Sequence, residues 1–166
     1  MAEVSESKRL WRTALIVAGV GVLVLVPLGW LALRMWDDNI QRRVIAANES
    51  AALTNLENIQ AAEQLYFEAN GEYGTLRQLI DSGIFQAQLS GEPPVASGYA
   101  YTVRVQPKTE THTPSYSVNA DPVRAEGRDA TGRRHFFVSS EVIGVRFNES
   151  RPATKDDKPR PKVSEY

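Results

Sequence analysis

The sequence contains no cysteine and only two histidines, His112 and His135, among its 166 residues. Without cysteine the chain can form no disulfide, thiolate metal site, covalent haem attachment or cysteine nucleophile. A metal site with three histidine ligands cannot be built from one such chain. The sequence also lacks a large excess of either positive or negative charge. It has 19 Lys and Arg residues and 20 Asp and Glu residues, for a formal net charge of -1. This balance gives no indication of a nucleic-acid partner.

Charge is absent from one long stretch, between Thr13 and Leu33. A helix of about 20 apolar residues spans the roughly 30 Å hydrocarbon core of a bilayer. The stretch is longer than the apolar part of a signal peptide, lacks a small-residue cleavage site and shows no amphipathic pattern. We therefore predict a transmembrane helix over residues 11–36, after a tail of residues 1–10. Tryptophan and basic residues flank it, as they commonly do at membrane interfaces: Lys8, Arg9, Trp11, Arg12, Trp30, Arg34 and Trp36.

The orientation of this helix is encoded weakly, because both flanks carry basic residues. Asp37 and Asp38 dilute the positive charge on the C-terminal flank, and a short N-terminal tail usually stays in the cytoplasm. We predict a single-pass protein of the inner (cytoplasmic) membrane with a cytoplasmic N-terminus and a periplasmic C-terminal domain. Membrane lipid is then one of its partners.

A second helical segment follows directly, because residues 37–70 contain neither proline nor glycine. Their apolar side chains recur in steps of mostly three and four, which is the period of one helix face. Asn70-Gly71 is a typical helix end, and Glu63 falls among the positions expected to be solvated. The apolar face can pack on the domain's own sheet or on neighbouring copies. We expect its C-terminal half to dock on the sheet. The face comprises Ile40, Val44, Ala47, Ala51, Leu56, Ile59, Ala62, Tyr66 and Ala69.

The rest of the chain predicts a short helix and four strands. Thr75 and Gln78 have the spacing of a capping box for a helix whose apolar side is Leu76, Leu79 and Ile80. From Tyr99 onward the apolar period changes to two, which predicts strands in an antiparallel meander. The fold class is therefore α+β, a long N-terminal helix packed on a small antiparallel sheet over residues 37–147. The predicted strands are 99–105, 116–120, 136–138 and 142–147.

The last segment, residues 148–166, is rich in charges and contains three prolines, Pro152, Pro159 and Pro161. It shows no apolar period, so we predict a disordered tail or one that wraps a partner.

This order of parts, together with two motifs, resembles the type IV pilin-like proteins and the pseudopilins of type II secretion. The motifs are Leu56-x-x-Ile59-x-x-Ala62-x-x-x-Tyr66 and Asn70-Gly71-x-Tyr73-Gly74-Thr75-Leu76-x-x-Leu79. The resemblance implies a pilin-like domain and a non-enzymatic structural subunit that packs through its N-terminal helix into a filament or a membrane complex. The partners would be other protein subunits, of its own kind or different.

The stretch from Ser7 to Thr13 departs from the family's processing site. It has no glycine, and no glutamate occurs between Glu6 and Glu49. This departure favours an unprocessed accessory subunit of another membrane complex, for example a bioenergetic one, over a mature pilin.

The residues that we predict to form the helix-assembly interface lie on both sides of the membrane boundary. Gly19, Gly21 and Gly29 would permit close approach of helices within the bilayer. The predicted interface consists of Val20, Val24, Pro27, Leu31, Val44 and Ala51.

Catalytic and metal chemistry find no support in the sequence. His112 stands in a polar loop with no defensible nucleophile or carboxylate partner, so we predict no enzyme activity and no cofactor. The acids of loop 121–129 are interleaved with Arg124 and Arg128, which favours an ordinary polar loop over a calcium site. A membrane-tethered binding module that uses the 106–114 loop or the tail stays as an alternative.

Overall fold

The computed structural model describes residues 3–86 and 89–160, with side chains on the first helix at Val26, Leu28 and Trp30 and from Arg34 onward. The chain divides into two compact units, Met1–Arg42 and Arg43–Tyr166. Helix α1, Glu3–Asn70, supplies the first unit and the beginning of the second. Among the residues described, no helix combines the length and apolarity that a membrane crossing needs. Most side chains of the predicted span, residues 11–36, are not among those described.

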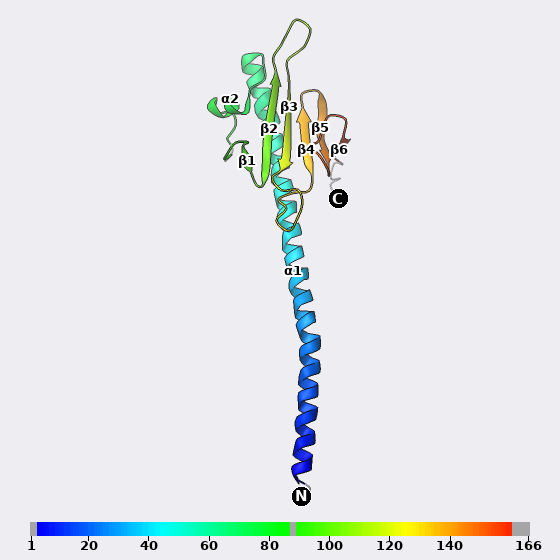
Figure 1. Cartoon of the computed structure of the whole chain (residues 1–166). Coiled ribbons are helices and arrows are strands. Elements are labelled where there is room, and N and C mark those ends of the chain that lie inside the picture. Colours follow the sequence, from blue (N-terminus) through cyan, green and yellow to red (C-terminus); the bar gives the residue numbers. More distant parts are fainter. Residues whose placement is uncertain (1–2, 87–88, 161–166) are drawn as a thin grey trace, which may run out of the picture. The chain divides into compact units, whose positions relative to one another are not determined.

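The second unit consists of the C-terminal part of α1, a short helix and six strands. The strands form one antiparallel sheet in the order β1-β2-β3-β4-β5-β6, so each strand pairs with its neighbours in the sequence (Figure 1). This confirms the α+β class and the meander, and it adds the two-residue edge strands β1 and β6. The elements are α2 Leu76–Asp81, β1 Val95–Ala96, β2 Tyr99–Gln106, β3 Ser115–Pro122, β4 His135–Ser139, β5 Val142–Asn148 and β6 Lys158–Pro159.

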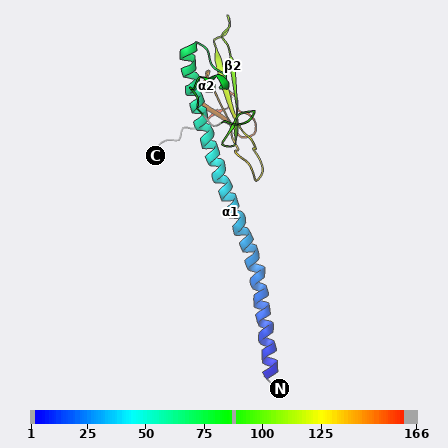
Figure 2. The same cartoon turned by 90° about the vertical axis from the view of Figure 1, so that its left-hand side faces the viewer.

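The C-terminal part of α1 packs on one face of the sheet, as the sequence predicted (Figure 2). Leu56 and Ile59 are fully buried there against alternate residues of the central strands. The predicted apolar face is wrong at its N-terminal end, because Ile45 is buried whereas Val44 is 44% exposed. The helix turns a different side to the sheet there than the simple three-and-four pattern predicted. The sheet residues in this core include Tyr99, Tyr101, Val118, Ala120, Phe136 and Val138.

Helix α2 begins at the predicted capping box, in which Thr75 accepts a hydrogen bond from Gln78 N and the Gln78 side chain accepts one from Thr75 N. Leu76 and Leu79 are buried, but Ile80 is 42% exposed. The prediction that Ile80 lies on the apolar side is therefore wrong. A six-residue helix has only one face against the core, and Leu76 and Leu79 fill it.

Residues 149–160 differ from the disorder that the sequence predicted. They turn back from β5, bury Ala153 to 2% exposure and add β6 to the edge of the sheet. The rest of the predicted tail, residues 161–166, lies outside the described residues.

Candidate interaction surfaces

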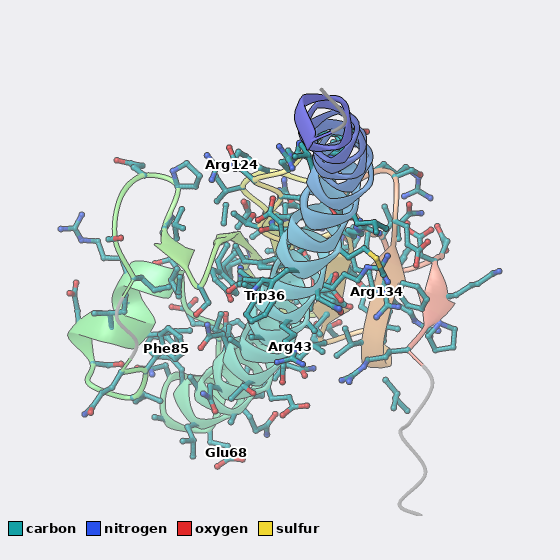
Figure 3. All side chains as sticks on the ribbon, turned by 90° about the horizontal axis from the view of Figure 1, so that it is seen from below. Trp36, Arg43, Glu68, Phe85, Arg124 and Arg134 are labelled. Carbon is teal, nitrogen blue, oxygen red and sulfur yellow. The ribbon has the colours of Figure 1, made fainter. Side chains whose placement is uncertain are left out.

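Large apolar side chains on α1 of the first unit are exposed. Trp30 is 59% exposed, Met35 63% and Trp36 71%. Figure 3 labels Trp36 on this part of α1. The Arg34 guanidinium lies over the Trp30 ring, with Cζ 4.4 Å from the ring centroid. Tryptophan beside arginine is typical of helix ends at a membrane–water interface, where the indole enters the headgroup region and the guanidinium stays hydrated. We call residues 30–36 the tryptophan segment.

The predicted assembly residues fall on both units of the chain. The side chains of Val20, Val24, Pro27 and Leu31 are not among those that the structure describes. Val44 is exposed on α1 of the second unit, and Ala51 is half-buried. Their role in assembly stays a prediction.

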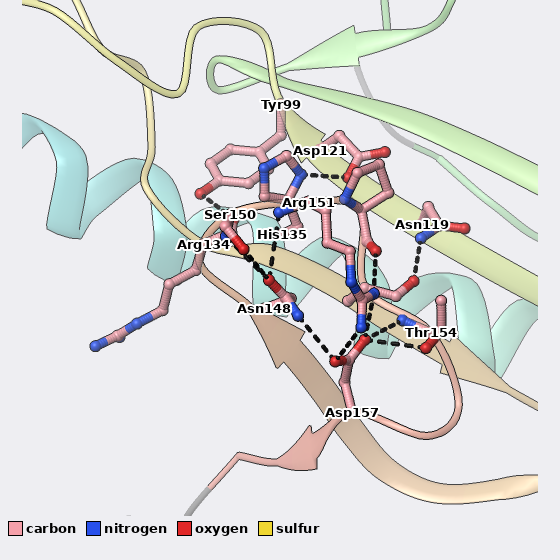
Figure 4. Close-up of polar contacts among 12 residues, drawn as sticks. Tyr99, Asn119, Asp121, Arg134, His135, Asn148, Ser150, Arg151, Thr154 and Asp157 are labelled. Carbon is pink, nitrogen blue, oxygen red and sulfur yellow. Dashed lines mark hydrogen bonds and ion pairs between the residues drawn. The ribbon is translucent and has the colours of Figure 1, made fainter.

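The outer face of the sheet, opposite α1, is covered in part by a loop that Asp157 holds together. Its carboxylate accepts hydrogen bonds from Asn148 Nδ2 and from Thr154 N, each at 2.8 Å. It also forms an ion pair with the Arg151 guanidinium at 2.8 Å (Figure 4). These contacts, the bond from Asn148 foremost, hold the pKa of Asp157 well below its usual range. We call residues 148–157 the tail latch.

The tail latch is also bound to the centre of the sheet. Asn119, on the outer side of β3, donates from Nδ2 to the carbonyl oxygen of Ala153 at 2.8 Å. Both residues are almost fully buried, so this hydrogen bond joins the latch to β3 in a place that water does not reach. Nothing in the local pattern of the tail indicates this contact, because its partner lies 34 positions away in the sequence.

A pocket of about 200 Å³ opens on the outer face beside the tail latch. Strands β2, β3 and β4 form its floor, the turn after β4 supplies Glu141, and the latch supplies Lys155. The sequence did not point to this pocket, because its residues come from separate strands and from a tail expected to be disordered. Most of its lining residues carry a polar group; they are Arg104, Gln106, Ser115, Tyr116, Ser117, Phe137, Ser139, Glu141 and Lys155.

The two histidines occupy unlike places. His112 is exposed in the β2–β3 loop, where Nδ1 lies 2.8 Å from the Thr111 hydroxyl oxygen, in keeping with the predicted polar loop. His135 begins β4, and its Nδ1 lies 2.6 Å from Asp121 Oδ1 on the neighbouring strand (Figure 4). The described hydrogen bonds join no serine or threonine hydroxyl to this His–Asp pair. The pair therefore links β3 and β4 through a contact between side chains on neighbouring strands.

Loop 121–129 is organised by Arg124. The arginine donates from Nε to the carbonyl oxygen of Asp129 at 2.9 Å, and its backbone N–H donates to the Thr131 hydroxyl at 3.1 Å. The described part of the chain holds no cluster of three or more acids and histidines that could bind a metal ion. An arginine inside the loop supplies the positive charge that a calcium ion would bring.

Glu63, expected to be solvated, is fully buried in α1 beneath the α1–α2 loop. Its Oε2 accepts a hydrogen bond from Gly74 N at 2.9 Å, whereas Oε1 has no partner among the described residues. Burial raises the pKa of this carboxyl from 4.5 to about 7, and the bond from Gly74 opposes the shift only in part. The expectation of a solvated position is therefore wrong. The sequence does not reveal that the backbone N–H of Gly74 needs an acceptor in the core, which Glu63 supplies.

No family model matches the chain, and neither do any of the curated proteins or solved structures.

Proposed function

We propose that this chain is a non-enzymatic, single-span membrane protein with a pilin-like domain, which assembles through α1 with other subunits of a membrane complex or filament. The uncharged stretch from Thr13 to Leu33 carries the proposal. The exposed tryptophan segment supports it, because Trp30, Arg34 and Trp36 lie at the C-terminal end of the stretch, where interface residues are expected. The long helix packed on an antiparallel meander agrees with the pilin-like motifs of the sequence.

Membrane anchoring is tested by a single charge in the stretch. Arginine at the centre of a membrane helix costs roughly 2.5–3.5 kcal/mol on insertion scales. Val24→Arg should therefore lower the fraction of protein that stays with membranes after carbonate extraction. Ala47→Arg, at an exposed position of the same helix, is the matched control and should remain bound. Complete extraction of the wild-type protein would contradict anchoring.

Orientation can be measured directly because the chain has no cysteine. Single-cysteine variants Ala2→Cys and Ser140→Cys are treated with a membrane-impermeant maleimide in intact spheroplasts. We expect label on Cys at position 140 only, because the C-terminal domain is proposed to be periplasmic. Label at position 2 alone would reverse the proposed topology.

Assembly through α1 predicts contacts between copies or with other subunits. Val44→Cys and Ala51→Cys should form crosslinked species in membranes under mild oxidation or with a short bifunctional maleimide. Arg77→Cys, at a more exposed position on α2, serves as the control and should stay uncrosslinked. Equal crosslinking at all three positions would indicate random collision and remove the case for this interface.

The two versions of the assembly role differ at the N-terminus. Mass spectrometry of the purified protein that finds an intact start at Met1 or Ala2 favours the accessory subunit of another membrane complex. A start near Leu10 favours a processed pilin. A protein that purifies in mild detergent as a monomer with no partners would count against both.

A further inference from the structure

The pocket beside the tail latch has the charge and the donors that an anionic ligand requires. Arg104 and Lys155 contribute two positive charges to its lining, and Glu141 contributes one negative charge, so the net lining charge is +1. Liquid water occupies about 30 Å³ per molecule, so a pocket of about 200 Å³ has room for a ligand of sugar-ring size.

Arg104 is oriented and only partly used. Its Nη1 donates to Asn119 Oδ1 at 3.0 Å, which fixes the side chain against the buried amide that also binds the latch. A guanidinium has five N–H donors, and within residues 3–86 and 89–160 the other donors of Arg104 have no partner, which leaves them available to a ligand. Arginine binds carboxylate and phosphate oxygens in pairs, and an arginine already held in place loses less entropy on binding.

Lys155 closes the opposite side of the pocket on a weak tether. Its Nζ lies 3.6 Å from Glu141 Oε2, with 60% of the Lys155 side chain and 57% of the Glu141 side chain exposed. Exposed ion pairs of this kind contribute little, so the ammonium group can turn from Glu141 to a ligand at low cost. The tail latch brings Lys155 to this place, because Thr154 and Asp157 on either side of it are bound to each other.

The floor of the pocket offers hydroxyl groups. Ser139 Oγ accepts from Glu141 N at 3.3 Å, and Ser115 Oγ donates to Gln106 at 3.1 Å. No hydrogen bond of the Ser117 hydroxyl occurs within residues 3–86 and 89–160. These groups both donate and accept, which suits a ligand that carries hydroxyls of its own.

A third cation stands beside the pocket. Arg146 lies opposite Phe137, a lining residue, in the β4–β5 register. Its Nε is buried without a hydrogen-bond partner, and no carboxylate in the described part of the chain forms an ion pair with it. Unpaired positive charge next to the pocket raises the potential that an anion meets there.

We propose that this pocket binds a small organic anion, an oxyanion group on a hydroxyl-bearing body of about sugar-ring size. Arg104 holds the oxyanion, Lys155 closes over it, and the serine hydroxyls bind the body. The oxyanion can be a carboxylate or a phosphate. This binding site goes beyond the structural role proposed above and does not depend on it.

The test is calorimetric titration of the full-length chain in mild detergent with three probes that share a sugar ring. D-glucuronate carries a carboxylate, glucose 6-phosphate carries a phosphate, and glucose carries no charge. We expect saturable binding of at least one anion and none of glucose, and the tighter anion identifies the oxyanion. Arg104→Gln should weaken binding about tenfold or more, the change expected when a charged hydrogen bond is lost. Ser117→Ala should have a smaller effect.

Two further variants keep the result interpretable. Arg77→Gln removes an exposed arginine on α2 and should leave the affinity within about twofold of the wild type. Arg104→Lys retains the charge without the paired donors, so it should bind with intermediate affinity if Arg104 clamps the ligand. Near-ultraviolet circular dichroism checks that each variant is folded. The proposal is overturned if neither anion saturates, if folded Arg104→Gln binds like the wild type, or if Arg77→Gln weakens binding equally.

Discussion

The two faces of the sheet are stabilised in different ways. On the face toward α1, Leu56, Ile59 and Val118 have no exposed surface and pack against one another and the neighbouring strands. On the outer face, contacts are polar and centre on Asn119 and Asp157. Apolar burial contributes about 25 cal/mol per Å², whereas hydrogen bonds and ion pairs near the surface add little beyond what water already offered.

The two faces therefore contribute different properties to the domain. The α1-facing side decides whether the domain folds, and the outer side decides which charged groups it presents and where. Glu63 is the exception on the first face, because a carboxyl is buried there among apolar and tyrosine side chains. Substitutions in the core, at Glu63, at Gly132 and at Asp157 of the tail latch test this difference, in order of decreasing expected loss of stability.

The largest loss should follow truncation in the core. Ile59→Ala removes a fully buried side chain between α1 and the sheet and should lower the free energy of unfolding by about 2–5 kcal/mol. Urea unfolding of the full chain in mild detergent, followed by near-ultraviolet circular dichroism, measures it. Leu65→Ala, 55% exposed on the same helix, should cost less than about 0.5 kcal/mol. Equal losses would mean that the outer side of α1 is also packed.

Glu63 should make the stability of the domain fall as the pH rises. Its pKa is about 7 in the folded chain, against 4.5 ordinarily, so folding takes up a proton between these values. The stabilisation is complete below pH 4.5, decreases through that window and is lost above about pH 7. Two to three pKa units correspond to about 3 kcal/mol in all. Urea midpoints measured at half-unit steps from pH 4 to pH 8 give the slope.

Glu63→Gln is the matched variant for this pH dependence. Its amide oxygen can still accept the hydrogen bond from Gly74 N, but the side chain no longer titrates. The slope assigned to Glu63 should then disappear. Tyr116, which faces Glu63 from β3, does not interfere because burial raises its pKa to about 12. A slope unchanged in Glu63→Gln would assign the pH dependence to other groups.

Gly132 should be the next most sensitive position, because of close approach and not because of a turn. A methyl group at this position would overlap the Tyr99 phenol. Tyr99 is fully buried, and its hydroxyl donates to the carbonyl oxygen of Arg134 at 2.9 Å. Gly132→Ala should therefore cost about 1–3 kcal/mol, as overpacking does, and should expose Tyr99 to nitration.

Gly127→Ala distinguishes overlap from backbone strain. Gly127 has a φ of 88°, which an alanine adopts only with strain, but nothing lies within 4 Å of the added methyl group. Its variant should lose stability without exposing Tyr99. Nitration of Tyr99 in both variants would show that loop strain alone releases the ring.

Much of the fold follows from local pattern. The period of two after Tyr99 predicted four strands, and the Thr75–Gln78 spacing predicted the helix cap, because neighbouring residues alone determine both features. The side of α1 that faces the sheet near Val44 could not be predicted from the sequence. Apolar residues occur on several sides of the helix there, and only packing against the sheet decides which of them is buried. Strands β1 and β6 are two residues long, too short to show any period.

The surfaces were predictable only in part. The tryptophan segment lies at the end of an uncharged stretch and is visible in the sequence. The pocket and the latch, in contrast, depend on contacts between distant residues. Asn119 meets Ala153, and Arg104 meets Asn119, only after the strands have paired and the tail has turned back. High charge and proline content favoured disorder in the prediction. The tail is ordered because the Asp157 carboxylate accepts hydrogen bonds from Asn148 and Thr154 within the tail itself.

The smallest effect on global stability should come from the tail latch. A variant in the latch tests most directly whether the outer face of the sheet contributes less to folding than the face toward α1. Asp157→Asn weakens the bonds from Arg151 and Thr154, so amide hydrogen exchange across residues 149–160 should accelerate while the urea midpoint stays that of the wild type. Because the pKa of Asp157 is lowered in the folded chain, the latch is present above its ordinary pKa of 3.8 and is lost as the pH falls below it. Asp156→Asn, at the exposed neighbouring position, should change neither quantity. If Asp157→Asn shifted the urea midpoint as far as Ile59→Ala does, the outer face would be as essential to folding as the core.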